Sequence, residues 1–129
     1  MCKDSLLICP CGSSLAYQRC CGHLHAGAVA EDAEALMRSR YCAYVLGRAD
    51  YLLATWHPST RPAGLHLEEE PRPKWLGLEV KRHAVTAPGQ AIVEFVARFR
   101  VAGRGQRMHE TSRFVRQEGR WYYLDGEVW

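Results

Sequence analysis

Four cysteines gather within a short stretch near the start of the sequence. They are Cys9, Cys11, Cys20 and Cys21, and they follow the spacing Cys-x-Cys, eight residues, Cys-Cys. Structural zinc sites use four thiolate or imidazole ligands arranged as a tetrahedron. Gly12 gives the backbone the freedom to curl around an ion. The pattern therefore predicts a closed zinc site of four thiolates, a zinc knuckle at the N-terminus.

The residues alone allow other interpretations of these cysteines. The cluster could be redox-active or incidental, and the adjacent Cys20 and Cys21 could form a strained disulfide. His23 or His25 could also replace Cys21 as the fourth zinc ligand. The only early apolar run is the three residues from Leu6 to Ile8, which is shorter than the apolar core of a signal peptide. We therefore expect a cytoplasmic protein, in which thiols stay reduced and clustered cysteines bind metal.

The elements that must position these residues begin with helices. Residues 31–46 carry acidic side chains at their start and apolar residues at helical spacing. This predicts a helix that Gly47 ends. A second, shorter helix is expected over residues 51–56, with Asp50 as its N-cap.

Strands follow the helices after a proline-rich connection over residues 58–73. After this connection, apolar and polar residues alternate with the period of a β-strand. The predicted strands start with the alternating Leu76, Leu78 and Val80 and continue over residues 91–101, 108–115 and 120–124. An antiparallel sheet with helices on one face is an α+β domain. We place this domain over residues 28–129, after a zinc module over residues 1–27.

The cysteine segment carries a resemblance to a known motif. CPCGSSLAYQRCC, residues 9–21, resembles the SEC-C zinc motif, best known from the C-terminus of the SecA translocation ATPase. The Cys-x-Cys-Gly-Ser start, the tyrosine at position 17 and the final Cys-Cys all match. The resemblance implies that Cys9, Cys11, Cys20 and Cys21 are the zinc ligands. It also implies a protein partner, since SEC-C motifs in the ATPase contact proteins.

Most of the remaining chain is similar to YchJ-like bacterial proteins. The matching segments are EALMRSRYCAYVLG (34–47), DYLLATWHPSTRP (50–62), WLGL (75–78) and HETSRFVRQEGRWYYLDG (109–126). In those proteins a SEC-C motif precedes a domain of the nuclear-transport-factor-2-like fold, a cone of helices packed on a curved antiparallel sheet. The resemblance implies this fold for the domain, with a cavity between sheet and helices, and it implies no particular reaction.

Strand parity indicates which polar side chains face such a cavity. In the strand over residues 108–115, Met108 and Phe114 are the plainest apolar residues. Glu110 and Ser112 share their parity and should therefore point inward as well. An inward carboxylate is costly unless a partner compensates it, so Glu110 is the first pocket candidate. Arg40, on the apolar side of the first predicted helix, could pair with it.

His57 is the second pocket candidate. It lies at a Trp-His-Pro corner, and an imidazole there could serve as a base. Aromatic and apolar side chains should form the walls of the pocket. The wall candidates are Tyr44, Trp56, Trp75 and Phe95.

Three functions compete on these observations. The zinc module could make the protein an adaptor that recruits a protein partner. The pocket around Glu110 and His57 could instead bind a small molecule or catalyse an isomerase, dehydratase or hydrolase reaction. Nucleic-acid binding through Arg98, Arg100 and Arg113 on the outer sheet face has the least support, because the net charge is only +3. No apolar run approaches the ~20 residues that span a bilayer, so no membrane association is expected.

Overall fold

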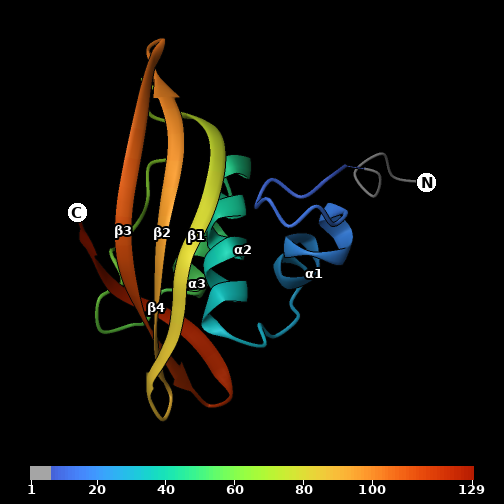
Figure 1. The fold of residues 1–129 in the computed structure, drawn as a ribbon, viewed down its shortest axis with the longest axis vertical. Helices are drawn as coiled ribbons and strands as arrows, with labels where there is room; N and C mark the ends of the chain where they lie inside the picture. The colour runs from blue at the N-terminus through green and yellow to red at the C-terminus, as the bar shows by residue number, and fades with distance from the viewer. Residues whose placement is uncertain (1–6) are drawn as a thin grey trace.

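A computed structural model describes residues 7–129, a short N-terminal module followed by helices and one sheet (Figure 1). The elements are the 3-10 helix η2 (Tyr17–Arg19), α1 (Cys21–His25), α2 (Ala33–Leu46), α3 (Ala49–Ala54), β1 (Lys74–Ala87), β2 (Gln90–Val101), β3 (Arg104–Gln117) and β4 (Arg120–Val128). Within this part of the chain, no helix combines the length and the apolar character needed to cross a membrane.

The four strands form one antiparallel sheet in the order β1-β2-β3-β4, which confirms the predicted meander. Helix α2 lies against one face of this sheet, and α1 packs on the side of α2 that is turned away from it (Figure 1). The α+β prediction is confirmed. β1 and β3 each run for 14 residues, longer than predicted, because their ends pair through the backbone although the side chains there are polar.

β1 departs from simple alternation near its start. The pairing register with β2 skips one residue between Trp75 and Gly77, so Leu76 is the extra residue of a β-bulge. The bulge turns both Trp75 and Leu78 toward the core and leaves Leu76 48% exposed. The expectation that Leu76 and Leu78 share a face was therefore wrong.

Helix α2 starts two residues later than predicted, at Ala33, and ends at Gly47 as predicted. The side chain of Asp32 caps it by accepting a hydrogen bond from the amide of Ala35 at 2.7 Å. Gly47 ends it with a φ of 73°, a left-handed conformation that glycine adopts without strain. These two caps fix the length of α2, which carries residues of both the cysteine cluster and the cavity.

Helix α3 begins earlier than predicted. It starts at Ala49, so Asp50 lies inside its first turn rather than at the N-cap. The Asp50 carboxylate pairs with the side chain of Arg48 at 3.0 Å. An acidic residue in the first turn still favours the helix through its dipole, which explains why the sequence signal looked like a cap.

A hydrophobic core lies between α2 and the inner face of the sheet. Met37 from α2 and Val93 and Phe114 from the sheet contribute to it. Three of the clustered cysteines, Cys9, Cys11 and Cys21, are buried in the same group of residues. The N-terminal module is therefore packed onto the domain and shares its core.

Candidate functional site

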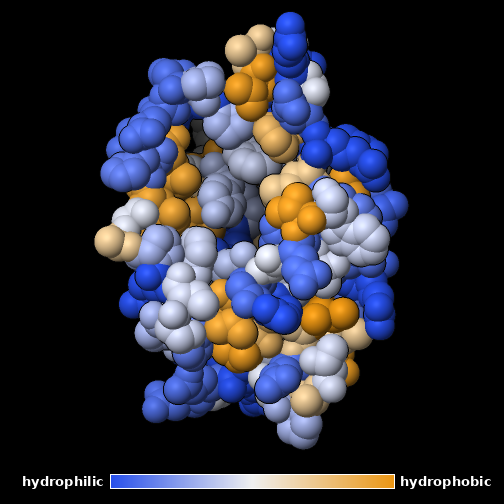
Figure 2. All heavy atoms as spheres, turned by 90° about the vertical axis from the view of Figure 1, so that its left-hand side faces the viewer, coloured by the Kyte–Doolittle hydropathy of each residue, from blue (hydrophilic) through white to orange (hydrophobic). Residues whose placement is uncertain are grey.

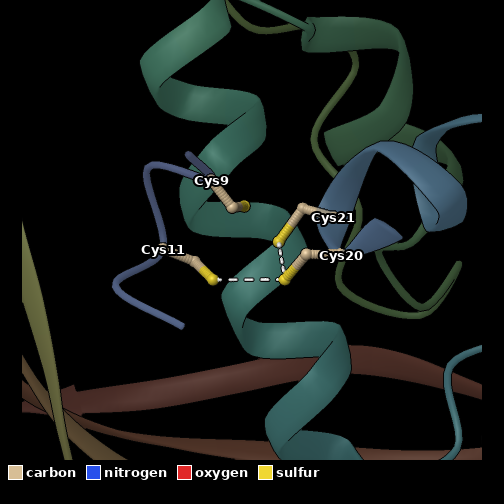
Figure 3. Close-up of side chains that lie close together, drawn as sticks. All are labelled: Cys9, Cys11, Cys20 and Cys21. Atoms are coloured by element: carbon tan, nitrogen blue, oxygen red, sulfur yellow. Dashed lines mark hydrogen bonds between the residues drawn. The ribbon is translucent and has the colours of Figure 1, made fainter. Parts of the chain in front are cut away.

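The four predicted ligand sulfurs converge on one point. The Sγ atoms of Cys9, Cys11, Cys20 and Cys21 all lie within 4.8 Å of one another, and their side chains point toward a common centre (Figure 3). The Sγ–Sγ distance is 3.6 Å for Cys11–Cys20 and 4.0 Å for Cys20–Cys21. A tetrahedron with zinc–sulfur bonds of about 2.3 Å places its sulfurs about 3.8 Å apart. The cluster therefore has the dimensions of a four-thiolate metal site.

A tight turn positions the first two cysteines. The amide of Cys9 donates to the carbonyl of Leu15 at 2.8 Å, which closes the turn. Gly12 has a φ of 86°, in the left-handed region where a side chain would add strain. The turn thereby directs the thiols of Cys9 and Cys11 to the same side.

The other two cysteines come from a pair of very short helices. Cys20 follows η2 and Cys21 opens α1. A Cβ at Gly22 would lie 2.7 Å from the carbonyl oxygen of Tyr17, so glycine allows the two short helices to pack closely. Ser13 places its Oγ 3.1 Å from Sγ of Cys20.

Helix α2 adds two contacts around the cluster. Nη1 of Arg38 donates to the carbonyl of Cys11 at 2.7 Å, while its Nε pairs with Glu34 at 3.0 Å. The fully buried Sγ of Cys42 lies 3.3 Å from Sγ of Cys9. A zinc ion with four thiolates carries a net negative charge. A guanidinium and a thiol donor at these places reduce the cost of burying that charge.

The thiols of the cluster differ in how readily they lose a proton. Hydrogen bonding, led by the thiol of Cys21, lowers the pKa of Cys11, and the same contact raises the pKa of Cys21. Burial raises the pKa of Cys20. The sulfurs therefore share protons unequally, and a divalent cation is the group that would hold all four as thiolates.

Neither histidine of the module is placed as a ligand. Nδ1 of His25 lies 2.6 Å from the hydroxyl of Tyr17, and Nε2 lies 2.8 Å from the carbonyl of Ser39. Both ring nitrogens are therefore engaged, Nδ1 within the module and Nε2 with α2. His23 is exposed and lies outside the group of converging sulfurs. The geometry therefore gives no support to a histidine in place of Cys21.

A cavity of about 270 Å³ lies between α2 and the inner face of the sheet. Figure 2 shows a hollow in the molecular surface, with hydrophobic side chains along part of its wall. Seven residues singled out from the sequence line the cavity: Arg40, Tyr44, Trp56, Trp75, Phe95, Glu110 and Ser112. The other lining residues are Met37, Tyr41, Ala97, Met108, Phe114 and Tyr123.

Arg40 is the buried cation of this cavity. Its side chain packs over two rings, with Cζ 5.1 Å from the Trp56 centroid and 4.6 Å from the Tyr123 centroid. Its Nη1 donates to the carbonyl of Leu52 and to Oγ1 of Thr55, both at 2.7 Å. Burial lowers the pKa of Arg40 to about 10, so the guanidinium stays charged at neutral pH.

Glu110 is the carboxylate of the same cavity, but it does not pair directly with Arg40. Its Oε2 accepts a hydrogen bond from the hydroxyl of Ser112 at 2.6 Å. Within residues 7–129, Arg40 forms no ion pair with any carboxylate, so the suggested Arg40–Glu110 pair is not seen. Burial also raises the pKa of Tyr123 to about 12, which keeps that phenol protonated. The cavity thus holds a separated cation and anion with a neutral donor near them.

Comparison with known families matches two regions of the chain. Residues 32–126 match the family described as YchJ, middle NTF2-like domain, and residues 8–22 match the SEC-C motif. The chain belongs to the YchJ family. Its α+β domain is therefore nuclear-transport-factor-2-like and follows a SEC-C motif, which confirms the fold and the family that the resemblance implied.

Relatives cover nearly the whole of this YchJ-family chain. A UPF0225 protein from Methylibium petroleiphilum is 59% identical over 129 residues, which is 98% of this chain and 92% of the relative. The solution structure of a SEC-C motif containing protein from Rhodopseudomonas palustris matches with a TM-score of 0.83 at 39% identity, covering 95% of this chain and 99% of that one. A crystal structure of a SEC-C motif containing protein from Psychrobacter arcticus matches with a TM-score of 0.79 at 32% identity, covering 98% and 85% of the two chains.

His57 lies outside the cavity of this YchJ-family chain. Its Nε2 is 2.8 Å from Oε1 of Gln117, and its Nδ1 is 2.7 Å from the hydroxyl of Ser59. The amide of His57 also donates to the carbonyl of Tyr123 at 2.8 Å. These contacts fix the corner after α3 against β3 and β4. They leave the imidazole away from Glu110, with which it was expected to share a pocket.

The outer sheet face does not form an unbroken basic surface. Arg113 donates two hydrogen bonds to Asp125, at 2.5 and 2.6 Å. Between the strands, a carboxylate oxygen of Glu94 lies 2.7 Å from Nε2 of His109. These acidic partners interrupt the arginines, so the structure adds little support for a phosphate-binding face.

Tyr123, Gly126 and Cys42 are among the residues of the two sites that sequence reasoning missed. Tyr123 lies in a run of apolar residues without alternation, so its direction could not be assigned from parity. Gly126 lies beyond the predicted strand over residues 120–124, yet it is inside β4, next to the side chain of Glu110. Cys42 was not predicted to lie at the cluster, because nothing in the sequence shows which face of α2 meets the module. Only the packing of α2 brings it to Cys9.

Proposed function

We propose that this chain is a zinc-binding protein in which the ion is structural and the cavity of the domain binds a small organic ligand. A closed set of four protein ligands leaves no position for a substrate, as in structural zinc sites. Three of the four cysteines are buried in the core of the domain, which also supports a structural role for the ion. Reduced thiols suit a cytoplasmic location, which we propose as well.

The zinc part of the proposal is tested on the purified full chain. Native mass spectrometry with elemental analysis should find one zinc ion per chain, and Cys20→Ser should lose it while Ser13→Ala keeps it. The proposal fails if no stoichiometric metal is present and all four clustered thiols react freely with an alkylating reagent in the folded protein.

One observation carries the cavity part of the proposal. Arg40 is only 6% exposed and lines the cavity, yet its partners within residues 7–129 are neutral oxygens and aromatic rings. A buried charge without a counter-charge at hydrogen-bond distance is costly. An arginine with a purely structural role would be expected to meet a carboxylate directly. A ligand that brings hydrogen-bond acceptors into the cavity would explain why Arg40 is buried there.

A thermal-shift screen of small metabolites tests the cavity against a filled variant. Ala97 is buried and lines the cavity, so Ala97→Leu should occupy ligand space. Val85→Leu is the control, because Val85 is 67% exposed on β1 and outside the lining. Ligands should raise the melting temperature of wild type and Val85→Leu but not that of Ala97→Leu. Equal shifts in all three proteins, or no shift in any, would contradict the proposal.

A second candidate function, an adaptor, has support from the surface of the module. Leu7, Ile8 and Leu15 are 58%, 63% and 53% exposed, and the amides and carbonyls beside them join the two segments of the zinc turn. Exposed apolar groups of this kind are typical of protein contacts. The test is cross-linking with mass spectrometry on wild type, Ile8→Ser and Leu15→Ser, with Val85→Ser as the control. Unchanged cross-linked partners in the module variants would rule the adaptor out.

Catalysis by Glu110 together with His57 is not part of this proposal. The two side chains lie in different places, with His57 held by Ser59 and Gln117 outside the cavity. A general base must lie within hydrogen-bond reach of the proton that it removes. The cavity is therefore proposed as a binding site.

A further inference from the structure

Two residues of the cavity lining, Arg40 and Trp56, carry hydrogen-bond donors that meet no acceptor within residues 7–129. Arg40 uses only Nη1, for the two neutral acceptors at 2.7 Å, and within residues 7–129 its Nε and Nη2 donate to no group. Nε1 of Trp56, another lining residue, is buried and also lacks a partner in the described chain. A carboxylate accepts several such bonds at once and pairs well with a guanidinium. These donors therefore suit the carboxylate of a ligand.

The guanidinium is held in place for such a contact. The rings of Trp56 and Tyr123 both lie near its Cζ, at 5.1 and 4.6 Å to their centroids. Together with the two bonds of Nη1, these contacts fix the plane of the group. A fixed guanidinium loses less entropy on binding than a mobile one.

A second feature of the cavity is an acceptor that is equally well held. Oε2 of Glu110 accepts from Ser112 at 2.6 Å, while within residues 7–129 its Oε1 accepts no hydrogen bond. Gly126 leaves the space that the carboxylate occupies, since a Cβ there would lie 2.9 Å from Cδ of Glu110. An ammonium group is the donor that a carboxylate binds most strongly. Glu110 therefore suits a ligand amine.

The remaining wall is apolar and the space is small. Trp75, Phe95 and Met108 contribute aromatic and thioether surface to the lining. The volume of about 270 Å³ lies just below the range of about 300–1,000 Å³ that is usual for ligand sites. A nucleotide or a folded peptide would exceed it, whereas a molecule of amino-acid size would fit.

We infer that the cavity binds a small zwitterion of the amino-acid class, with its carboxylate at Arg40 and Trp56, its amine at Glu110 and an apolar body against Trp75 and Phe95. This inference rests on the proposed function of the cavity and adds the chemical class of its ligand. The two charged groups are kept apart in the protein because each binds the opposite charge of the ligand.

Matched sets of three compounds test the class by isothermal titration of the zinc-loaded full chain. One set is L-phenylalanine, phenethylamine and 3-phenylpropanoate, and the other is L-leucine, isoamylamine and 4-methylpentanoate. Each analogue keeps the body and removes one charge. An amino acid from at least one set should bind about tenfold or more tightly than both of its analogues, since each analogue lacks one charge-assisted hydrogen bond.

Two conservative variants separate the charged groups of the site. Glu110→Gln should weaken the binding of the amino acid and of the amine about tenfold, and it should change the affinity for the acid by no more than about twofold. Trp56→Phe keeps a ring and removes the N–H. It should therefore weaken the binding of the amino acid and of the acid and leave the binding of the amine unchanged. Glu118→Gln, in the exposed turn between β3 and β4, is the control and should change none of them.

The outcomes distinguish this inference from the function on which it rests. If an analogue with one charge binds as tightly as its amino acid, or if Glu110→Gln weakens acid and amine equally, the zwitterion class is wrong. If neither set binds but another metabolite stabilises wild type and not Ala97→Leu, the class is wrong and the binding function stands. If no compound in the screen or in the sets binds, both proposals fail.

Discussion

Replacing Gly126 with alanine should disturb Glu110 through one added carbon. Gly126 lies on β4 opposite Ser112 of β3. A Cβ at Gly126 would lie 2.9 Å from Cδ of Glu110 and 3.2 Å from its Cγ. Carbon atoms pack best at about 3.5–4.0 Å. The flexible end of Glu110 must therefore swing away, and the hydrogen bond from Ser112 at 2.6 Å is lost.

The expected cost follows from that bond and from the backbone. A hydrogen bond to a charged group contributes about 1.5–3 kcal/mol, and Ser112 is buried and has little access to water as a substitute. Alanine in a strand is favoured over glycine by about 0.5–1 kcal/mol. The difference predicts that Gly126→Ala lowers the free energy of unfolding by about 0.5–2.5 kcal/mol.

Urea unfolding at a fixed zinc concentration measures this cost, because any change in bound metal would shift the apparent stability. Gly105→Ala is the matched control, since a Cβ there meets nothing within 4 Å, and it should not destabilise. The deciding measurement repeats Gly126→Ala in a Glu110→Ala background, where the added carbon has no carboxylate to displace. If the cost is the same in both backgrounds, the proposed contact between Gly126 and Glu110 is not its cause.

Removing zinc with a chelator should lower the thermal unfolding midpoint, because Cys9, Cys11 and Cys21 belong to the core; an unchanged midpoint in protein shown to be metal-free would contradict a structural ion. Cys42→Ala should speed the transfer of zinc to a chromogenic chelator, since Cys9 loses the thiol 3.3 Å from its sulfur, and equal rates in variant and wild type would argue against that contact. His25 should be neutral at pH 7 with its proton on Nε2, which faces the carbonyl of Ser39 at 2.8 Å. Burial lowers the pKa of His25 below 6.5, so its contribution to stability is present above pH 6.5 and is lost as the pH falls through the lower folded value. Nitrogen NMR of the ring together with urea unfolding checks this, and a ring that titrates at or above 6.5 would refute it.

The fold could be predicted because its signals are local. Apolar residues alternate along β2, and Val93, Phe95 and Ala97 are buried as that alternation indicates. The pairing of β2 with β3 has no bulge, so parity also gave the inward direction of Glu110 and Ser112. Where the strands are regular, the alternation in the sequence therefore predicts which side chains face the cavity.

The contacts between elements could not be predicted in the same way. Whether Arg40 meets Glu110 depends on how far α2 lies from β3, and no local pattern specifies that distance. The direction of Trp75 depends on the bulge at Leu76, which has no distinctive sequence. His57 shows the same limit, since its partner Gln117 is 60 residues away and is set by the path of the chain after α3.

Helix α2 explains how a metal module and a cavity can depend on each other in so short a chain. Arg38 and Cys42, one turn apart, contact the cysteine cluster. Arg40 and Tyr44, also one turn apart, line the cavity from another side of the same helix. A buried helix moves as a unit because its neighbours are closely packed. A metal that fixes the module on one side of α2 therefore also fixes the position of the guanidinium on the other, which is the feature of the cavity that a ligand carboxylate would recognise.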